Sequence, residues 1–454
     1  MNKNKATPNT VSFPTLPAES EELIGDVETF LESAVLSMQQ APPPYRGPGR
    51  PPILPSLALW AGMVVCVLHG FTSQLDLWRL LRDRGIWSFP RFPVEDQAVY
   101  KRLGTEGTGP LQWLFQNITT LLTQRITVAA TIALAPFAKG VYALDETTLD
   151  AVARKLPALR GRPPGDPLLP GKLAGLFDLR RQLWVRLQFQ DDPHQNEKVL
   201  ARTLLLGLAV GSLILADLGY FGFAWFDWLT DHGYHWVSRL RAKTSYTVIH
   251  VFYEAGETFD GIVWLGAHRA DRAAHAARLI RFRVGNTLYQ YVTNVMDPTV
   301  LPPLEVARLY ARRWDIELAV LLVKEHLKLH LLWSCKTAVI QQQIWAVLII
   351  AQVLQALRLE IAWRAGVDPF EVSMALLVKY APRYAAEGRD PVAVFVERGR
   401  ELRFIRPSRR ILIRGPEIPP EALAPAPADL VVVRTPRYAE RKCMPHEHSK
   451  KTKN

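Results

Sequence analysis

The stretch LYARRWDIELAVLLVK, from Leu309 to Lys324, decides how this sequence is interpreted. As an α-helix, which turns by about 100° per residue, it gathers four polar side chains in a stripe about 60° wide. These side chains are Tyr310, Arg313, Glu317 and Lys324. Such a stripe is not a typical core face. It predicts that Glu317 binds a metal ion while Arg313 and Lys324 hold phosphates. The alternative is a surface i,i+4 ion pair between Arg313 and Glu317.

Two short apolar strands precede this helix, and each is predicted to end in an aspartate. Residues 141–145 read VYALD, and residues 212–217 read SLILAD. Two Mg²⁺ ions roughly 3.5–4 Å apart can activate a water and stabilise a leaving oxygen. Mg²⁺ favours a few carboxylates over a full protein cage. Asp145, Asp217 and Glu317 are therefore candidate metal ligands, although any one strand-end aspartate could instead belong to an ordinary turn.

The order of elements from residue 141 onward predicts a mixed α/β sheet flanked by helices. A hairpin is expected over Lys172–Phe189, and a β-rich stretch over Thr244–Val295. Two long helices follow, over Leu304–Leu331 and Ile340–Trp363. We predict a flexible Pro-rich arm (1–53), a helical, DNA-binding N-terminal domain (54–135), a core in two parts (136–243 and 301–365) around a β-rich insertion (244–300), and a C-terminal region with a basic tail (366–454).

Composition favours a polyanionic partner, because the net charge is +12 and the sequence pI is about 9.6. Nucleic acid and an anionic membrane surface both fit this charge. The three cysteines, Cys66, Cys335 and Cys443, lie far apart, which argues against a zinc site or a disulfide framework. The apolar runs are shorter than the roughly 20 residues that a bilayer requires. We therefore expect a soluble, cytoplasmic protein.

The N-terminal region offers two further candidates for DNA contact. Residues 46–52 read RGPGRPP and resemble an AT-hook, in which Arg50 would enter a narrow A·T minor groove. A Pro-rich linker explains the same residues. Val94–Leu103 carries Gln97, Tyr100, Lys101 and Arg102 on a short helix, which is either a recognition helix or an ordinary solvated helix.

The spacing Tyr-x2-Arg-x3-Glu-x6-Lys resembles the YREK signature of the insertion-sequence-four family of DDE transposases. Three further segments are similar to blocks of that family: Leu144–Leu149 to the first aspartate block, Ala216–Phe221 to the second, and Tyr291–Asn294 to the strand before the signature helix. The resemblance covers roughly residues 140 to 330 in the family's order. It differs in the extra acid Glu146 and in the Pro- and Gly-rich stretch Arg154–Pro170.

The resemblance implies a ribonuclease-H-like catalytic core that is interrupted by the β-rich insertion. It implies that Asp145, Asp217 and Glu317 bind two Mg²⁺ ions, for which Mn²⁺ can substitute. Tyr310, Arg313 and Lys324 would contact the DNA of the transposon ends. Trp264 lies alone among tryptophans between residues 237 and 313, so it would stack on a flipped base; otherwise it is a core residue of the insertion.

The implied reaction is hydrolysis at each transposon end, followed by attack of the freed 3′-hydroxyl on target DNA. The resemblance also implies second-strand cleavage through a DNA hairpin and a homodimer that joins the two ends. Two alternatives remain: a metal-dependent nuclease without strand transfer, and a transposase-derived DNA-binding protein that has lost its chemistry. A peripheral membrane protein is disfavoured, because no helix carries a large basic amphipathic face.

Overall fold

A computed structural model describes residues 23–40, 53–126, 132–148, 172–190, 197–268 and 272–408, and parts of 410–437. The chain divides into two compact units. Unit 1 takes its described residues from Met1–Ala133, Asp145–Asn196 and Trp314–Leu412. Unit 2 takes its described residues from Leu134–Leu144, Glu197–Arg313 and Ile413–Asn454. The AT-hook-like segment with Arg50, and the stretch Arg154–Pro170, lie outside the described residues.

Unit 2 is built on a sheet with the strand order β1-β4-β5-β9-β8-β7-β6. Strands β1 (Val141–Thr148), β4 (Leu213–Ala216) and β5 (His235–Arg239) run parallel. All four residues of β4 are buried and apolar, as expected for a strand covered on both faces. The helical elements of this unit are α7 (Glu197–Leu205), η5 (Leu218–Tyr220), α8 (Phe223–Asp231), α9 (Pro303–Arg312) and η9 (Pro420–Ala422).

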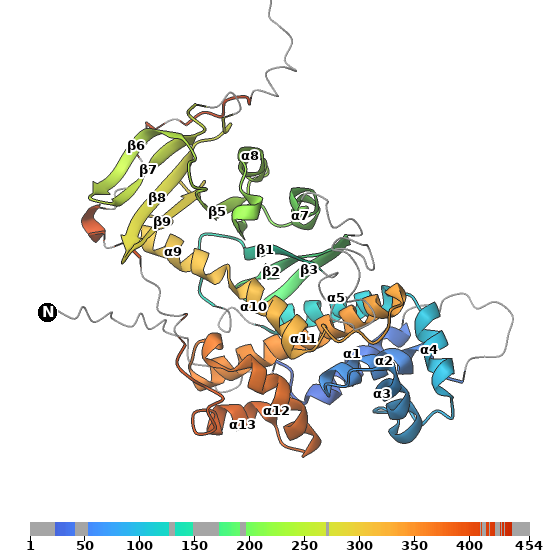
Figure 1. The fold of residues 1–454 in the computed structure, drawn as a ribbon. Helices are drawn as coiled ribbons and strands as arrows, with labels where there is room; N and C mark the ends of the chain where they lie inside the picture. Colours follow the sequence, from blue (N-terminus) through green and yellow to red (C-terminus); the bar gives the residue numbers. More distant parts are fainter. Residues whose placement is uncertain are drawn as a thin grey trace, which may run out of the picture. The chain divides into compact units, whose positions relative to one another are not determined.

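The other four strands of unit 2 form an antiparallel meander (Figure 1). They are β6 (Tyr246–Ala255), β7 (Thr258–Leu265), β8 (Ala277–Val284) and β9 (Thr287–Thr293). Gly256 and Gly285 lie in the turns with positive φ angles of 57° and 59°, which glycine adopts without steric cost. The β-rich character predicted for Thr244–Val295 is confirmed at the level of its strands.

Unit 1 combines a hairpin with a set of helices. The hairpin strands are β2 (Lys172–Asp178) and β3 (Leu183–Gln190), and the strand order there is β3-β2-β1. The N-terminal helical elements are α1 (Val27–Leu36), η1 (Ser37–Gln40), α2 (Ser56–Leu68), α3 (Gln74–Arg79), η2 (Leu80–Arg84), α4 (Asp96–Thr105) and α5 (Gly109–Arg125). The others are α10 (Asp315–Leu321), η6 (Leu322–His326), α11 (Thr337–Ala365), η7 (Pro369–Glu371), α12 (Met374–Ala386) and α13 (Pro391–Arg398).

Helix α11 is long and apolar enough to cross a membrane by length and composition, but its apolar window is entirely buried inside the protein. Its polar side chains bind the backbone of neighbouring elements. Gln352 bonds both the N–H and the C=O of Trp184 at 2.9 Å, and the Gln342 amide donates to the carbonyl of Leu103 at 2.8 Å. These contacts match the predicted core helix, because buried polar groups persist in a core when they are hydrogen-bonded.

The mixed α/β sheet predicted from the sequence is thus present. A DNA-binding role for the N-terminal helices stays a prediction. In α4, Arg102 is engaged inside the protein, because it pairs with Glu106 at 2.6 Å and donates to Ser56 at 2.7 Å. Lys101 of the same helix is exposed and remains available to a partner.

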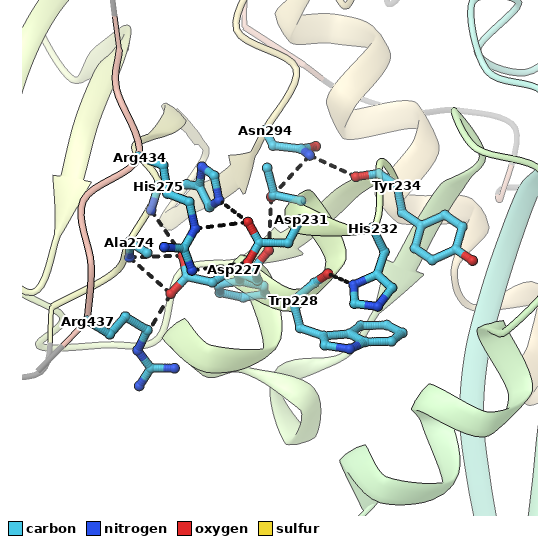
Figure 2. A network of polar contacts seen from close by, with 12 residues as sticks. Asp227, Trp228, Asp231, His232, Tyr234, Ala274, His275, Asn294, Arg434 and Arg437 are labelled. Carbon is cyan, nitrogen blue, oxygen red and sulfur yellow. Dashed lines mark hydrogen bonds and ion pairs between the residues drawn. The ribbon is translucent and has the colours of Figure 1, made fainter. Parts of the chain in front are cut away.

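A C-terminal segment, residues 432–437, is attached to α8 of unit 2 (Figure 2). The Arg434 guanidinium binds both carboxylate oxygens of Asp231, at 3.0 and 3.2 Å, and Arg437 lies 3.7 Å from Asp227. The amide of Thr435 donates to the carbonyl of Ala274 at 2.8 Å. The attachment therefore combines charge pairs with a backbone hydrogen bond.

The two aspartates of this attachment have pKa values shifted in opposite directions. Burial raises the pKa of Asp227. Burial also opposes ionisation of Asp231, but hydrogen bonds from Arg434 and His275 outweigh it and lower the pKa of Asp231. A lowered folded-state pKa means that Asp231 contributes stability above its unfolded pKa of about 4, and this contribution is lost as the pH falls through the folded value. The raised pKa of Asp227 has the opposite sign, so its ionisation costs stability as the pH rises through that value.

Replacing Arg434 by glutamine is expected to loosen this segment at neutral pH. Partly exposed ion pairs contribute about 0.2–1 kcal/mol, so amide exchange at Thr435 should accelerate by a factor between roughly 1.4 and 5. Hydrogen exchange measured by mass spectrometry would report it. Arg283→Gln, which removes an exposed partner of Glu257 in the same unit, is the matched control and should leave Thr435 unchanged. Equal exchange in wild type and Arg434→Gln would show that the charge pair does not hold the segment.

Candidate active site

Asp145 lies inside strand β1 and not at its end, because the strand continues to Thr148. The prediction that the strand ends at Asp145 is therefore wrong. Residues Asp145 and Thr147, on one face of the strand, line a cavity of about 20 Å³ in unit 1. Glu146 instead forms a partly buried ion pair with Lys172 at 3.3 Å. The alternation that separates Asp145 from Glu146 is confirmed, and Glu146 has a structural partner.

Lys324 lines the same cavity as Asp145. Its Nζ donates to the carbonyl oxygen of Thr148 at 3.2 Å. The remaining wall is mostly apolar and consists of Leu173, Gly175, Trp184, Leu187, Val320, Val323, Leu329 and Leu348. A cavity of this size has room for about one water molecule. Unit 1 therefore places an acid and a cation of the predicted site on one small, largely apolar surface.

The predicted helix over Leu304–Leu331 is not one helix. Helix α9 ends at Arg312, residues 313 and 314 form a turn, α10 begins at Asp315, and the π-helical turn η6 contains Lys324. The stripe calculated for a continuous α-helix therefore does not hold along its whole length. Tyr310 and Arg313 belong to unit 2, whereas Glu317 and Lys324 belong to unit 1.

Buried polar anchors in unit 1 explain why α10 starts where it does. Asp315 accepts hydrogen bonds from Gln182 at 2.9 Å and from Arg410 at 3.0 Å. Gln182, in the β2–β3 turn, accepts in turn from Arg358 at 3.0 Å. The side chain of Asp315 has no exposed surface, so these bonds offset the cost of its desolvation. They fix α10 two residues before Glu317, and nothing in the sequence pattern indicated them.

In unit 2, a cluster of phenols and guanidinium groups surrounds Tyr310. The Cζ atoms of Arg313 and Arg239 lie 5.7 and 6.0 Å from its ring centroid, and the Tyr291 ring centroid lies at 5.1 Å. Burial raises the pKa of Tyr310; the charge of Asp217 adds to this shift, and the two arginines oppose it. Burial raises the pKa of Tyr291 to about 12. Both phenols therefore keep their protons at neutral pH and can donate hydrogen bonds.

Asp217 follows β4 directly, where its Oδ1 accepts from the amide of Gly219 at 2.9 Å and caps η5. Arg239 was not predicted from the sequence, although its position at the end of β5 resembles that of Asp217 after β4. Guanidinium groups recognise phosphates through charge-assisted hydrogen bonds. Asp217 thus belongs to the same cluster as Tyr310, Arg313 and Arg239.

Two of the predicted metal ligands directly follow paired strand residues. Leu144 of β1 pairs with Ala216 of β4 in parallel; the next residues in the sequence are Asp145, which belongs to unit 1, and Asp217, which belongs to unit 2. An all-oxygen donor set of this kind fits Mg²⁺, which also takes substrate phosphates and waters as ligands. Among the residues that the structure describes, no three His, Cys, Asp or Glu side chains form a ready-made cluster. Glu317 belongs to unit 1 and Asp217 to unit 2.

Trp264 is half-buried in β7, where its indole N–H donates to the carbonyl of Ala273 at 2.8 Å. The Arg272 guanidinium lies 5.5 Å from its ring centroid. These contacts describe a partly packed tryptophan, and its stacking on a DNA base stays a prediction.

Residues 139–353 match a family model described as Transposase DDE domain. The matched segment begins just before β1 and ends within α11, so it contains Asp145, Asp217 and Glu317. A search of curated proteins finds no match to the chain. The match, together with the mixed sheet, supports a DDE transposase, a class of metal-dependent enzymes that act on DNA.

Proposed function

We propose that this protein is a DNA transposase of the insertion-sequence-four type, which cleaves the ends of its element and joins them to target DNA. The observation that carries the proposal is the match of residues 139–353 to a transposase DDE domain, a segment that contains Asp145, Asp217 and Glu317. Glu317 is proposed as the third carboxylate. Its helix is held by Asp315, which is bonded to Gln182 and Arg410.

In the proposed mechanism, Asp145, Asp217 and Glu317 hold two Mg²⁺ ions, for which Mn²⁺ can substitute. When bound, such ions activate the attacking oxygen and stabilise the leaving 3′ oxygen. The phenolic O–H of Tyr310 donates a hydrogen bond to a phosphate oxygen of the transposon end, and Arg313 and Arg239 hold the same backbone by charge. Lys324 neutralises phosphate charge beside Asp145. Trp264 is the proposed stacking partner for a flipped base, and Arg50 a contact in a minor groove.

The proposed function implies two DNA partners, the terminal inverted repeats and the target DNA. A homodimer would hold two ends together. We further propose second-strand cleavage through a DNA hairpin and a place at the nucleoid in the cytoplasm. A simple nuclease on the same fold would cleave the ends without joining them. Incubating cleaved ends with a supercoiled plasmid distinguishes the two, because only a strand transferase joins the labelled 3′ end to the plasmid.

Metal removal is the direct test of the proposed chemistry. End cleavage is expected to stop in EDTA and to return with excess Mg²⁺, because two-metal-ion hydrolysis needs bound ions to activate the attacking oxygen and to stabilise the leaving oxygen. Fe²⁺ with ascorbate and peroxide should cut the polypeptide next to Asp145, Asp217 and Glu317, and Mg²⁺ should compete with this cutting. Cleavage of DNA in EDTA, or Fe²⁺ cuts elsewhere, would contradict the metal assignment.

A further inference from the structure

Unit 1 contains a second cavity, which is lined in part by the C-terminal end of η6 and the residues that follow it. It is a groove of about 530 Å³, here called the α12 groove, formed by α12, the end of α2 with the following loop, and residues 325–328. Its charged and titratable lining residues are His69, Glu325, His326, Lys328, Lys379 and Arg383. Helix α12 packs against η6, whose Val323 and Lys324 line the cavity that contains Asp145. One short segment therefore lines both the α12 groove and the proposed catalytic surface.

The permanent charge of the α12 groove is positive. Lys328, Lys379 and Arg383 are exposed, whereas Glu325 lies 3.8 Å from His330. Burial lowers the pKa of His326, so this imidazole adds no charge at neutral pH. Within the described part of the chain, Lys379 and Arg383 make no ion pair. The Nζ of Lys379 and the Cζ of Arg383 lie 5.3 and 5.6 Å from the centroid of the Tyr380 ring.

The placement of Lys379 and Arg383 is unfavourable for the isolated protein. They are four residues apart on α12, where like charges destabilise a helix by about 0.2–0.5 kcal/mol. Four residues also separate them by about 6 Å along the helix axis, and Lys328 stands on another wall of the groove. Cations spread in this way suit a chain of phosphates better than one small anion.

We propose that the α12 groove binds the phosphodiester backbone of DNA, with Lys328, Lys379 and Arg383 as the phosphate contacts. The inference rests on the proposed function only in taking DNA as the polyanion. Contacts to phosphates carry no sequence information, so the groove adds affinity without sequence preference. It provides a track for DNA that continues from the Lys324 side of the proposed active site.

The test is the salt dependence of DNA binding in EDTA, with a short duplex of unrelated sequence and a duplex carrying the element's end. Lys379→Gln with Arg383→Gln is expected to reduce the slope of log K against log salt by about 1.8, at about 0.9 for each lost phosphate contact. Arg383→Lys, which keeps the charge, should retain the wild-type slope. The matched control is Arg400→Gln with Arg406→Gln, which removes two exposed charges of unit 1 outside the groove.

An equal loss on both duplexes supports the proposal, because phosphate contacts do not read sequence. A wild-type slope in the double variant, or the same loss in the matched control, overturns it. Complete displacement of the unrelated duplex by inorganic phosphate at constant ionic strength would also overturn it, since that result describes a single-anion site. The outcome is separable from the proposed function, because binding in EDTA requires no cleavage, and cleavage can fail while the slope still changes.

Discussion

Replacing Glu317 by glutamine is expected to abolish cleavage of the transposon end while binding of that end persists. Glutamine keeps the shape of the side chain and removes the charge that a divalent ion requires. The loss of rate should be at least roughly 100-fold, the scale seen when a transition-state charge loses its stabilising group. The measurement is cleavage of a labelled end duplex in Mg²⁺, with binding followed separately in EDTA.

The matched control for this experiment is Glu401→Gln. Glu401 lies in unit 1 and forms an exposed ion pair with Arg398 at 2.9 Å, so its change removes the same charge away from the proposed site. It should cleave as wild type does. If Glu317→Gln also cleaves at the wild-type rate, Glu317 is a surface partner only, and the catalytic assignment of α10 is wrong.

The largest expected effect on stability comes from a buried ion pair in unit 2. Arg278 and Asp260 have no exposed side-chain surface; Arg278 donates to Asp260 at 2.6 Å and to the carbonyl of Leu301 at 2.7 Å. Arg278→Met leaves the Asp260 carboxylate buried without its guanidinium, which costs about 3–5 kcal/mol. Urea unfolding with hydrogen exchange of β7 and β8 would measure it, because the two units need not unfold together.

Two variants sharpen this prediction. Asp260→Leu combined with Arg278→Met removes both charges, so it should recover most of the stability, as apolar replacements of buried pairs do. Arg283 lies on the same strand as Arg278, but its ion pair with Glu257 is exposed. Arg283→Met should therefore change stability little. A small effect of Arg278→Met would mean that the pair is solvated in solution.

Much of the secondary structure could be predicted from the sequence, because local patterns produce it. The all-apolar run of β4, the hairpin β2–β3 and the meander β6–β9 follow from short apolar or alternating segments punctuated by turn residues. Helix α11 was predicted as a core element from polar residues inside its apolar run, and its glutamines are bonded to neighbouring backbone.

The sequence was less informative wherever one segment's conformation depends on a distant partner. The continuous helix expected over Leu304–Leu331 is broken at residues 313 and 314, while Asp315 is bound by Gln182 and Arg410 from segments far away in the chain. Periodicity reports only neighbours within the same helix, so it cannot register such bonds.

The spacing of Tyr310, Arg313, Glu317 and Lys324, the mixed α/β class and the strands next to Asp145 and Asp217 can be read from the sequence, because strands and helices arise from contacts between near neighbours in the chain. Sites arise from packing that brings distant segments together. The structure was therefore needed to learn that Asp145 and Lys324 line one cavity, that Arg239 joins Tyr310 and Arg313, and that Lys328, Lys379 and Arg383 line the α12 groove.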